Sequence, residues 1–143
     1  WDNDGDLDLV TLNIGSVSQF NLFEQGNDNS FVKKEPGPLQ NVDGTLCLPA
    51  VVDINGDSLP DVVVSDGLEV RYYERDLGGL VEKRGHENPF RSIAGMGGAC
   101  GHLSIADWDN DGHMDLLITD WVLPMRHFRE SGGAFHLQTA KTW

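Results

Sequence analysis

Asp107-Trp108-Asp109-Asn110-Asp111-Gly112-His113-Met114-Asp115, residues 107–115, is the stretch that decides the fold, because the chain repeats it. A second copy, Asp53-Ile54-Asn55-Gly56-Asp57-Ser58-Leu59-Pro60-Asp61, occupies residues 53–61. The chain opens inside a third copy, Trp1-Asp2-Asn3-Asp4-Gly5-Asp6-Leu7-Asp8. Aligning Trp1 with Trp108 gives intervals of 53 and 54 residues. Periods of this size indicate repeated supersecondary units.

The copies share the pattern D-x-[DN]-x-D-x-x-x-D, which places oxygen-bearing side chains at every second residue of a tight turn. Hard cations such as Ca²⁺ bind about six to eight oxygens from carboxylates, amides, backbone carbonyls and water. The predicted side-chain ligands are Asp107, Asp109, Asp111 and Asp115, then Asp53, Asn55, Asp57 and Asp61, and in the incomplete copy Asp2, Asp4 and Asp8. The predicted backbone ligands are the carbonyl groups of His113, Leu59 and Asp6. The sequence thus predicts three Ca²⁺ loops.

Glycine stands at the sharp bend of two loops but not of the third. Gly5 and Gly112 occupy a position where a positive φ is expected, which glycine adopts without steric cost. The middle copy has Ser58 there and its glycine at Gly56, so we expect that loop to be strained or differently shaped. Because Asn55 replaces an aspartate, we also expect it to bind calcium more weakly.

The residues after each loop argue against an EF-hand. An EF-hand needs a bidentate glutamate at the twelfth position of the loop, and helices on both sides. The twelfth residues here are Thr11, Val64 and Ile118, and none of them carries a carboxylate. The segments 8–12, 61–65 and 115–119 are short and apolar, which predicts buried strands. Each loop is therefore expected to join two strands.

An acidic run can also be an ordinary solvated loop, and for a single copy the two interpretations are about equally good. Three copies in register, each followed by an apolar strand, favour metal binding. The loops hold eleven of the 23 acidic residues, and without them the net charge of −13 becomes −2. Charge concentrated in this way repels itself unless a cation neutralises it.

Length and composition narrow the classes of protein to which the chain can belong. The 143 residues have the size of one domain, and the 17 glycines suit a turn-rich all-β protein. The apolar runs are too short for a transmembrane helix, and the negative charge argues against nucleic acid and anionic membranes as partners. Because the chain begins inside a motif, we expect it to be an internal fragment, and the absence of a signal peptide therefore says little.

Two cysteines, Cys47 and Cys100, lie 53 residues apart, which is again the repeat period. Sequence leaves two alternatives for them, a disulfide between neighbouring repeats or two free buried thiols, because it does not fix the Cα separation. Their spacing is not that of a CxxC metal site.

Each repeat divides into four short strands separated by turns. The strands entering a loop are predicted at Leu46–Val52 and His102–Ala106, and those leaving one at Leu9–Leu12, Val62–Ser65 and Leu116–Thr119. A third strand is predicted at Phe20–Glu24, Glu69–Glu74 and Met125–Glu130, and a fourth begins at Phe31, Leu80 or Phe135. Radial repetition of four-stranded units is the architecture of a β-propeller.

We therefore predict an all-β fold, a partial β-propeller of four-stranded blades with calcium loops between the first two strands of each blade. It forms a single segment over residues 1–143. Repeat 1 covers about residues 1–45 and lacks its entering strand, repeat 2 covers about 46–99, and repeat 3 covers about 100–143.

The phrase Asp-Trp-Asp-Asn-Asp-Gly-x-x-Asp-Leu-Leu at 107–117 resembles the FG-GAP/VCBS repeats of integrin-α-like propellers. The stretch Gly95-Met96-Gly97-Gly98 leading to Ile105-Ala106-Asp107 is similar to the variant in cartilage acidic protein and its microbial relatives, as are Asn21-Leu22-Phe23 and Phe31. The resemblance implies calcium in the loops, a propeller, and an extracellular, cell-surface or lumenal setting. The Phe-Gly and Gly-Ala-Pro signatures that name the family are not clearly present.

The chain has no G-x-S-x-G, H-E-x-x-H or P-loop motif, and we predict no catalytic residues and no enzymatic activity. The glycine cluster at 95–101 leads into a strand, which favours a turn over a phosphate site. The histidines His86, His102, His113, His127 and His136 lack metal-ligand spacing and are expected at the surface. The aromatic residues Tyr72, Tyr73, Phe128, Trp121 and Trp143 are expected to pack between blades.

Two functional classes remain. The favoured one is a calcium-binding module with a structural, adhesive or protein-interaction role, and the alternative is a fragment of a propeller lyase or hydrolase acting on polysaccharides. A pocket with convergent His, Tyr, Arg or acidic groups would favour the enzyme. Fewer than three blades leave apolar faces and strand edges uncovered, so we expect other chains or further blades to cover them, with glycan as a further candidate ligand.

Overall fold

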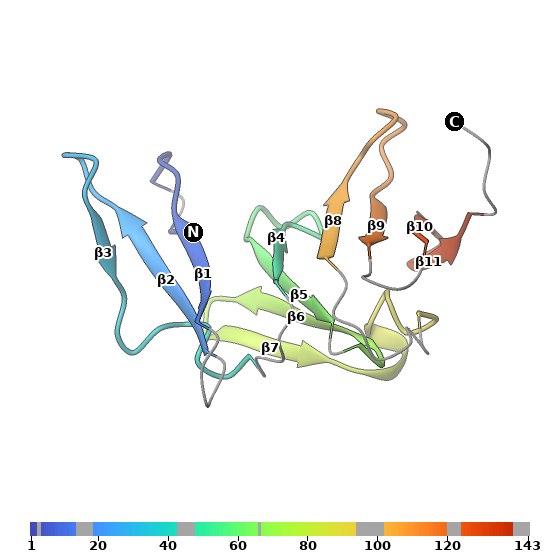
Figure 1. Ribbon diagram of the computed structural model, residues 1–143, viewed down its shortest axis with the longest axis horizontal. Helices are drawn as coiled ribbons and strands as arrows, with labels where there is room; N and C mark the ends of the chain where they lie inside the picture. Colours follow the sequence, from blue (N-terminus) through green and yellow to red (C-terminus); the bar gives the residue numbers. More distant parts are fainter. Residues whose placement is uncertain are drawn as a thin grey trace.

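The computed structural model describes residues 1–2, 4–13, 19–42, 48–65, 67–93, 102–119 and 124–138. These residues form three antiparallel sheets in which the strands follow one another in sequence order (Figure 1). Sheet 1 consists of β1 (Leu9–Asn13), β2 (Gln19–Gln25) and β3 (Phe31–Lys33). Sheet 2 consists of β4 (Ala50–Val52), β5 (Asp61–Ser65), β6 (Val70–Asp76) and β7 (Gly79–Lys83). Sheet 3 consists of β8 (His102–Ala106), β9 (Asp115–Thr119), β10 (Arg126–Ser131) and β11 (Ala134–Leu137).

The apolar sequences of the strands after the acidic loops explain the centre of the fold. All five residues of β5 are buried, including the run Val62-Val63-Val64. Successive side chains of a strand point to opposite faces, so a strand that is apolar at every position must be covered on both faces. Sheet 2 accordingly lies between sheets 1 and 3 and shares a core with each.

Two hydrophobic clusters join the sheets. The first lies between sheets 1 and 2 and consists of Phe20, Leu22, Leu39, Val42, Val62, Val64 and Tyr73. The second lies between sheets 2 and 3 and consists of Val63, Val70, Tyr72, Phe90, Ile93, Leu116, Ile118, Phe128 and Phe135. The expectation that Tyr72, Tyr73 and Phe128 pack between the repeats is confirmed, whereas Trp121 and Trp143 lie outside the described residues.

The all-β class and the four-strand repeat were predicted correctly for sheets 2 and 3, and sheet 1 has the three strands expected of a repeat without its entering strand. The strand predicted at Leu46–Val52 is too long among the residues that the structure describes, because β4 covers Ala50–Val52 and residues 48–49 precede it, while residues 46–47 are not described. Pro49 lacks the N–H that a ladder requires, which ends the strand at this point. Cys47, Cys100 and the glycine cluster at 95–101 lie outside the described residues.

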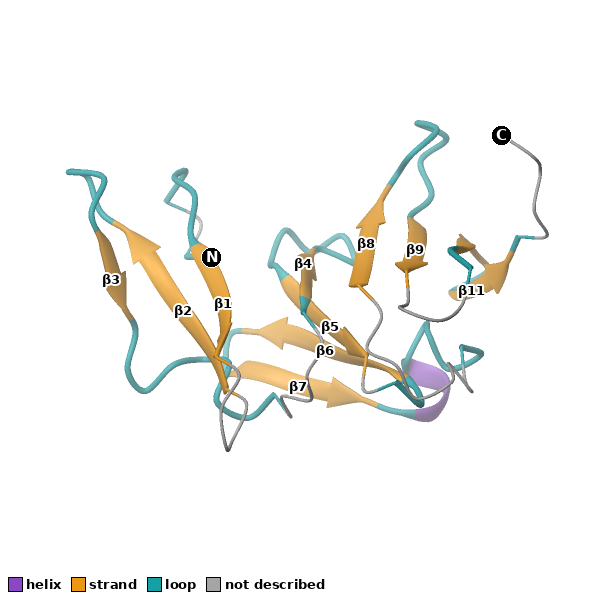
Figure 2. Ribbon diagram, viewed as in Figure 1, coloured by secondary structure: helices purple, strands orange, loops and turns teal. Residues whose placement is uncertain are grey.

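Helical structure among the described residues is limited to one short 3₁₀ turn, η1 (Gly85–Glu87), which follows β7 (Figure 2). It leads into Phe90 and Ile93, which are fully or almost fully buried between sheets 2 and 3. Of the residues that the structure describes, none belongs to a helix with the length and apolar character needed to cross a bilayer.

Candidate metal loops

The acidic repeats lie at equivalent places in the three sheets. Loop 1 (residues 1–8) precedes β1, loop 2 (53–61) joins β4 to β5, and loop 3 (107–115) joins β8 to β9. All three lie towards the upper side of the view in Figure 1. The prediction that each loop directly precedes the apolar strand of its repeat is therefore confirmed.

Loops 2 and 3 share one network of backbone hydrogen bonds. The first aspartate of each loop accepts at both carboxylate oxygens: Asp53 from the N–H groups of Asp57 (3.2 Å) and Ser58 (2.8 Å). In loop 3, Asp107 accepts from Asp111 (3.1 Å) and Gly112 (2.9 Å). The last aspartate closes each loop, because Asp61 accepts from Ile54 N–H and Asp115 from Trp108 N–H. The two sequences thus fold into the same turn.

Loop 1 shares one hydrogen bond with loops 2 and 3. The N–H of Asp6 donates to Asp4 at 3.1 Å, as Leu59 donates to Asp57 at 2.8 Å and His113 to Asp111 at 3.0 Å. The three residues predicted to offer a backbone carbonyl therefore occupy equivalent positions. The Oδ1 atom of Asp6 is buried and has no hydrogen-bond partner. A buried carboxylate oxygen without a partner is costly unless a cation is bound.

Carboxylate oxygens converge most closely in loop 3. One oxygen from each of Asp107, Asp109 and Asp115 lies within 4.8 Å of the other two, which is the only such acidic group in the described part of the chain. Oxygens that bind one Ca²⁺ at about 2.3–2.6 Å must lie within roughly 5 Å of one another. The fourth predicted side-chain ligand, Asp111, is exposed and lies next to this group in the turn. The donor set and its spacing therefore fit a hard cation.

The backbone at Ser58 is strained, because this residue adopts a positive φ at the position where the other two loops have glycine. Its φ is +69°, and the aligned Gly112 has a φ of +89° and Gly5 a φ of +100°. A side chain at such a φ costs on the order of 1 kcal/mol. The sequence left two alternatives for loop 2, a strained backbone or a different shape. Because loop 2 keeps the hydrogen bonds of loop 3, the structure supports strain.

Replacing Ser58 by glycine should raise the free energy of unfolding by up to about 1 kcal/mol, because glycine relieves the strain at the cost of a more flexible unfolded chain. The measurement is chemical denaturation of the wild type and the variant. The matched control is Gly112→Ser, which places a side chain at the same bend of loop 3 and should destabilise by a similar amount. A Ser58→Gly variant less stable than the wild type would contradict the assignment of strain.

The last aspartate of each loop is its anchor in the sheet. Asp61 is fully buried and accepts from Arg75 N–H (2.8 Å), Ile54 N–H (3.0 Å) and the Tyr72 hydroxyl (2.9 Å). Asp8 accepts from Gln25 N–H in the same way, at 3.0 Å. In sheet 3 the equivalent N–H, that of Glu130, donates instead to the Met114 carbonyl at 2.9 Å. Asp115 Oδ1 is thereby left for two basic side chains, His127 at 2.9 Å and Arg129 at 3.4 Å.

These partners shift the pKa values of the two equivalent aspartates, Asp61 and Asp115, in opposite directions. Burial raises the pKa of Asp61, and its three hydrogen bonds do not fully offset the effect. Burial also acts to raise the pKa of Asp115, but hydrogen bonds from His127, Trp108 N–H and Arg129 outweigh it, so that this pKa lies below its usual value. Asp115 is therefore held as a carboxylate without help from a metal ion.

Sequence reasoning missed His127 and Arg129. His127 was expected at the surface, yet its ring is about one-fifth exposed and contacts Asp115. Both residues lie on β10, where Arg129 is paired opposite Asp115. The alternation of His127 and Arg129 on one strand face was visible in the sequence, but their partner depends on the register between β9 and β10.

The structure has one cavity beside loop 2 and another at the far end of sheet 1. One of about 510 Å³ lies between loop 2 and sheet 3, where Asp53, Ile54, Met114, Glu130 and Phe135 contribute to its walls. Hydrogen bonds from Gly133 N–H and the His113 ring lower the pKa of Glu130, so this group stays ionised. Of the groups that would favour an enzyme, the described lining of this cavity contains the acidic residues Asp53 and Glu130, and it contains no His, Tyr or Arg.

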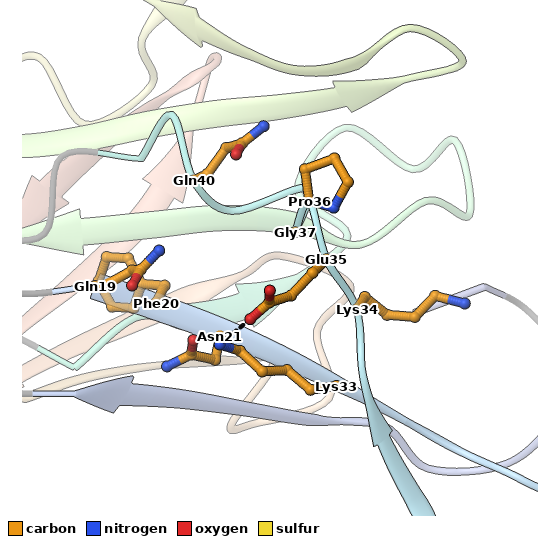
Figure 3. A pocket seen from close by; sticks show the side chains of 9 residues that line it. All are labelled: Gln19, Phe20, Asn21, Lys33, Lys34, Glu35, Pro36, Gly37 and Gln40. Carbon is orange, nitrogen blue, oxygen red and sulfur yellow. Dashed lines mark ion pairs between the residues drawn. The ribbon is translucent and has the colours of Figure 1, made fainter.

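The other cavity, of about 350 Å³, lies at the end of sheet 1 opposite loop 1, since β1 and β2 pair Asn13 with Gln19 and Leu9 with Phe23. Figure 3 shows the ion pair of Lys33 with Glu35 beside Asn21, and two further amide side chains, Gln19 and Gln40, elsewhere in the lining. This cavity is separate from the candidate metal loops and was not anticipated from the sequence.

Comparison with protein families gives one match, to the FG-GAP-like repeat, over residues 1–64 and again over residues 53–118. The two matches start within one residue of the repeat period seen in the acidic loops, and together they span 118 of the 143 residues. No curated protein and no solved structure matches the chain.

Proposed function

Because the chain belongs to the FG-GAP-like repeat family, we propose that it is a calcium-binding segment of a β-propeller with a structural, adhesive or protein-interaction role. The observation that carries the proposal is the convergence of Asp107, Asp109 and Asp115 in loop 3. An oxygen-only donor set with this many protein ligands suits Ca²⁺ better than Mg²⁺, which is smaller and retains several waters.

Two further features support the calcium assignment. Loops 2 and 3 have the same backbone network around their first aspartates, so loop 2 holds its predicted ligands on the same turn. The strand order of sheets 2 and 3 is that of propeller blades, with each loop between the first two strands. In such a site, the aspartates would hold the ion, and the ion would neutralise the loop and fix its turn.

The interaction role is supported by the exposed apolar residues on the outer strands. Phe31 and Val32 on β3 are 50% and 60% exposed, and Leu137 on β11 is 57% exposed. β3 and β11 are edge strands, which offer unpaired backbone groups as well as apolar side chains. We propose that further blades or other protein chains cover these edges, in an extracellular, cell-surface or lumenal assembly.

Isothermal titration calorimetry tests the calcium assignment. The full chain should bind Ca²⁺, and the double variant Asp107→Ala, Asp111→Ala should lose the heat that belongs to loop 3, because two of its four carboxylates are gone. The matched control is Asp28→Ala, Asp76→Ala, which removes two acids from turns outside the loops. The assignment fails if Mg²⁺ binds with equal affinity, or if the loop variant and the control behave alike.

A further inference from the structure

A positively charged side chain from β10, Arg129, contacts the carboxylates of loop 3. The guanidinium of Arg129 contacts three of the four predicted side-chain ligands: its Nη2 donates to Asp109, its Nη1 lies 3.3 Å from Asp111 Oδ2, and its Nε lies 3.4 Å from Asp115 Oδ1. Asp115 is almost completely buried, whereas the Arg129 side chain is about one-third exposed. The guanidinium therefore binds the same carboxylates that a metal ion would need.

The other two sheets have the opposite charge at this position. The strand registers place Glu24 of β2 and Glu74 of β6 where β10 has Arg129. Each glutamate pairs with a lysine of its own repeat, Glu24 with Lys34 just after β3 and Glu74 with Lys83 of β7 at 3.1 Å. In sheets 1 and 2 this position thus takes part in an ion pair with a neighbouring lysine, and in sheet 3 it supplies a cation to the loop.

The convergence of the loop 3 carboxylates has a physical cause in this arrangement. Carboxylates that share a small volume repel one another, and a guanidinium with several hydrogen-bond donors offsets part of that repulsion. In the described chain, loop 3 is the place where three carboxylates come within 4.8 Å of one another, and it is also the loop that Arg129 contacts.

We propose that Arg129 is an internal counter-cation, which holds the carboxylates of loop 3 together without calcium and is displaced when calcium binds. The displacement half of this inference rests on the proposed function. Two opposite effects follow, because the same contacts stabilise the metal-free loop and compete with the ion. Loop 3 should remain ordered in a chelator, and its calcium affinity should be lower than four carboxylates alone would give.

The test is the variant Arg129→Gln, which removes the charge and keeps a polar side chain of similar reach. The control is Lys83→Gln, which changes the net charge by the same amount but removes a cation paired with Glu74 outside the loops. Terbium, which replaces calcium in oxygen sites, reports on loop 3 through the indole of Trp108, and calcium is then titrated in competition. A Trp108→Phe variant identifies the part of the signal that belongs to loop 3.

We expect Arg129→Gln to bind calcium at loop 3 roughly tenfold more tightly than the wild type, since an ion pair of several contacts must no longer be broken. Lys83→Gln should change the affinity by less than about twofold. An affinity in Arg129→Gln that is unchanged or weaker overturns the displacement.

Thermal unfolding in a chelator gives a second readout that does not depend on calcium binding. Arg129→Gln should melt several degrees below Lys83→Gln in the chelator, because its metal-free loop 3 has lost its counter-cation. If the two variants melt together, the counter-cation role is overturned. If neither the wild type nor Arg129→Gln binds calcium or terbium, the proposed function fails and the displacement fails with it, while the melting comparison still decides whether Arg129 stabilises the loop.

Discussion

Replacing Phe90 by alanine should lower the free energy of unfolding by about 3–5 kcal/mol, because it leaves a large cavity in the core between sheets 2 and 3. Phe90 is fully buried. Its ring stacks on Phe135 with centroids 4.5 Å apart, and it meets the edge of Tyr72 at 6.2 Å. Its N–H also donates to Asn88 at 2.9 Å, which fixes the turn after η1. The loss therefore affects contacts that join two repeats, and not one sheet alone.

Chemical denaturation at fixed calcium concentration measures this effect. The matched control is Phe31→Ala, which truncates the same side chain at a position that is 50% exposed and should cost less than about 1 kcal/mol. If Phe90→Ala yields no folded protein, Phe90→Leu leaves a smaller cavity and should give an intermediate loss. A Phe90→Ala variant as stable as Phe31→Ala would show that sheets 2 and 3 do not share a core in solution.

Removal of calcium should also have a large effect on stability. A ligand that binds only the folded state adds RT ln(1 + [L]/Kd) to its stability, which is about 2.7 kcal/mol per site when calcium exceeds Kd 100-fold. A chain of this size should lose on the order of 5–10 °C in Tm for each site emptied. Loops 2 and 3 each lead into a buried strand, β5 or β9, so an emptied loop weakens the strand that its last aspartate anchors.

Thermal melts with calcium and with a chelator measure this loss. The double variant Asp107→Ala, Asp111→Ala should respond less to the chelator than the wild type, because one site is already absent. The wild type with magnesium in place of calcium should melt close to the chelated protein. A Tm that is indifferent to the chelator would show that the loops are not structural calcium sites.

The sequence predicts much of this fold because its strongest signals are local. The acidic phrase fixes each loop, and the valine run of 62–64 identifies a strand covered on both faces. The turn at Ser58 could likewise be anticipated, since glycine aligns with it in the other copies. The error at Leu46–Val52 is of a different kind, because hydrophobic character extended the predicted strand past Pro49, where backbone pairing stops.

The least predictable part of the site is the pair His127 and Arg129. Both residues are separated from loop 3 by at least 12 residues of chain, and their role depends on a register between β9 and β10 that local patterns do not fix. The sequence shows a basic pair on a strand, but not that it faces a carboxylate. The same limitation applies to Arg75, whose guanidinium lies 4.5 Å from the Trp1 ring centroid in the neighbouring repeat.

The complete burial of β5 also determines the order in which the three sheets unfold. Val62 and Val64 belong to the cluster shared with sheet 1, and Val63 belongs to the cluster shared with sheet 3. In a linear array, stability is a sum of terms for single units and for contacts between nearest neighbours. An outer sheet can open at the cost of one such contact, whereas sheet 2 loses two. Local opening should therefore begin at the outer sheets, and the amides of β5 should exchange with solvent only when the whole array unfolds.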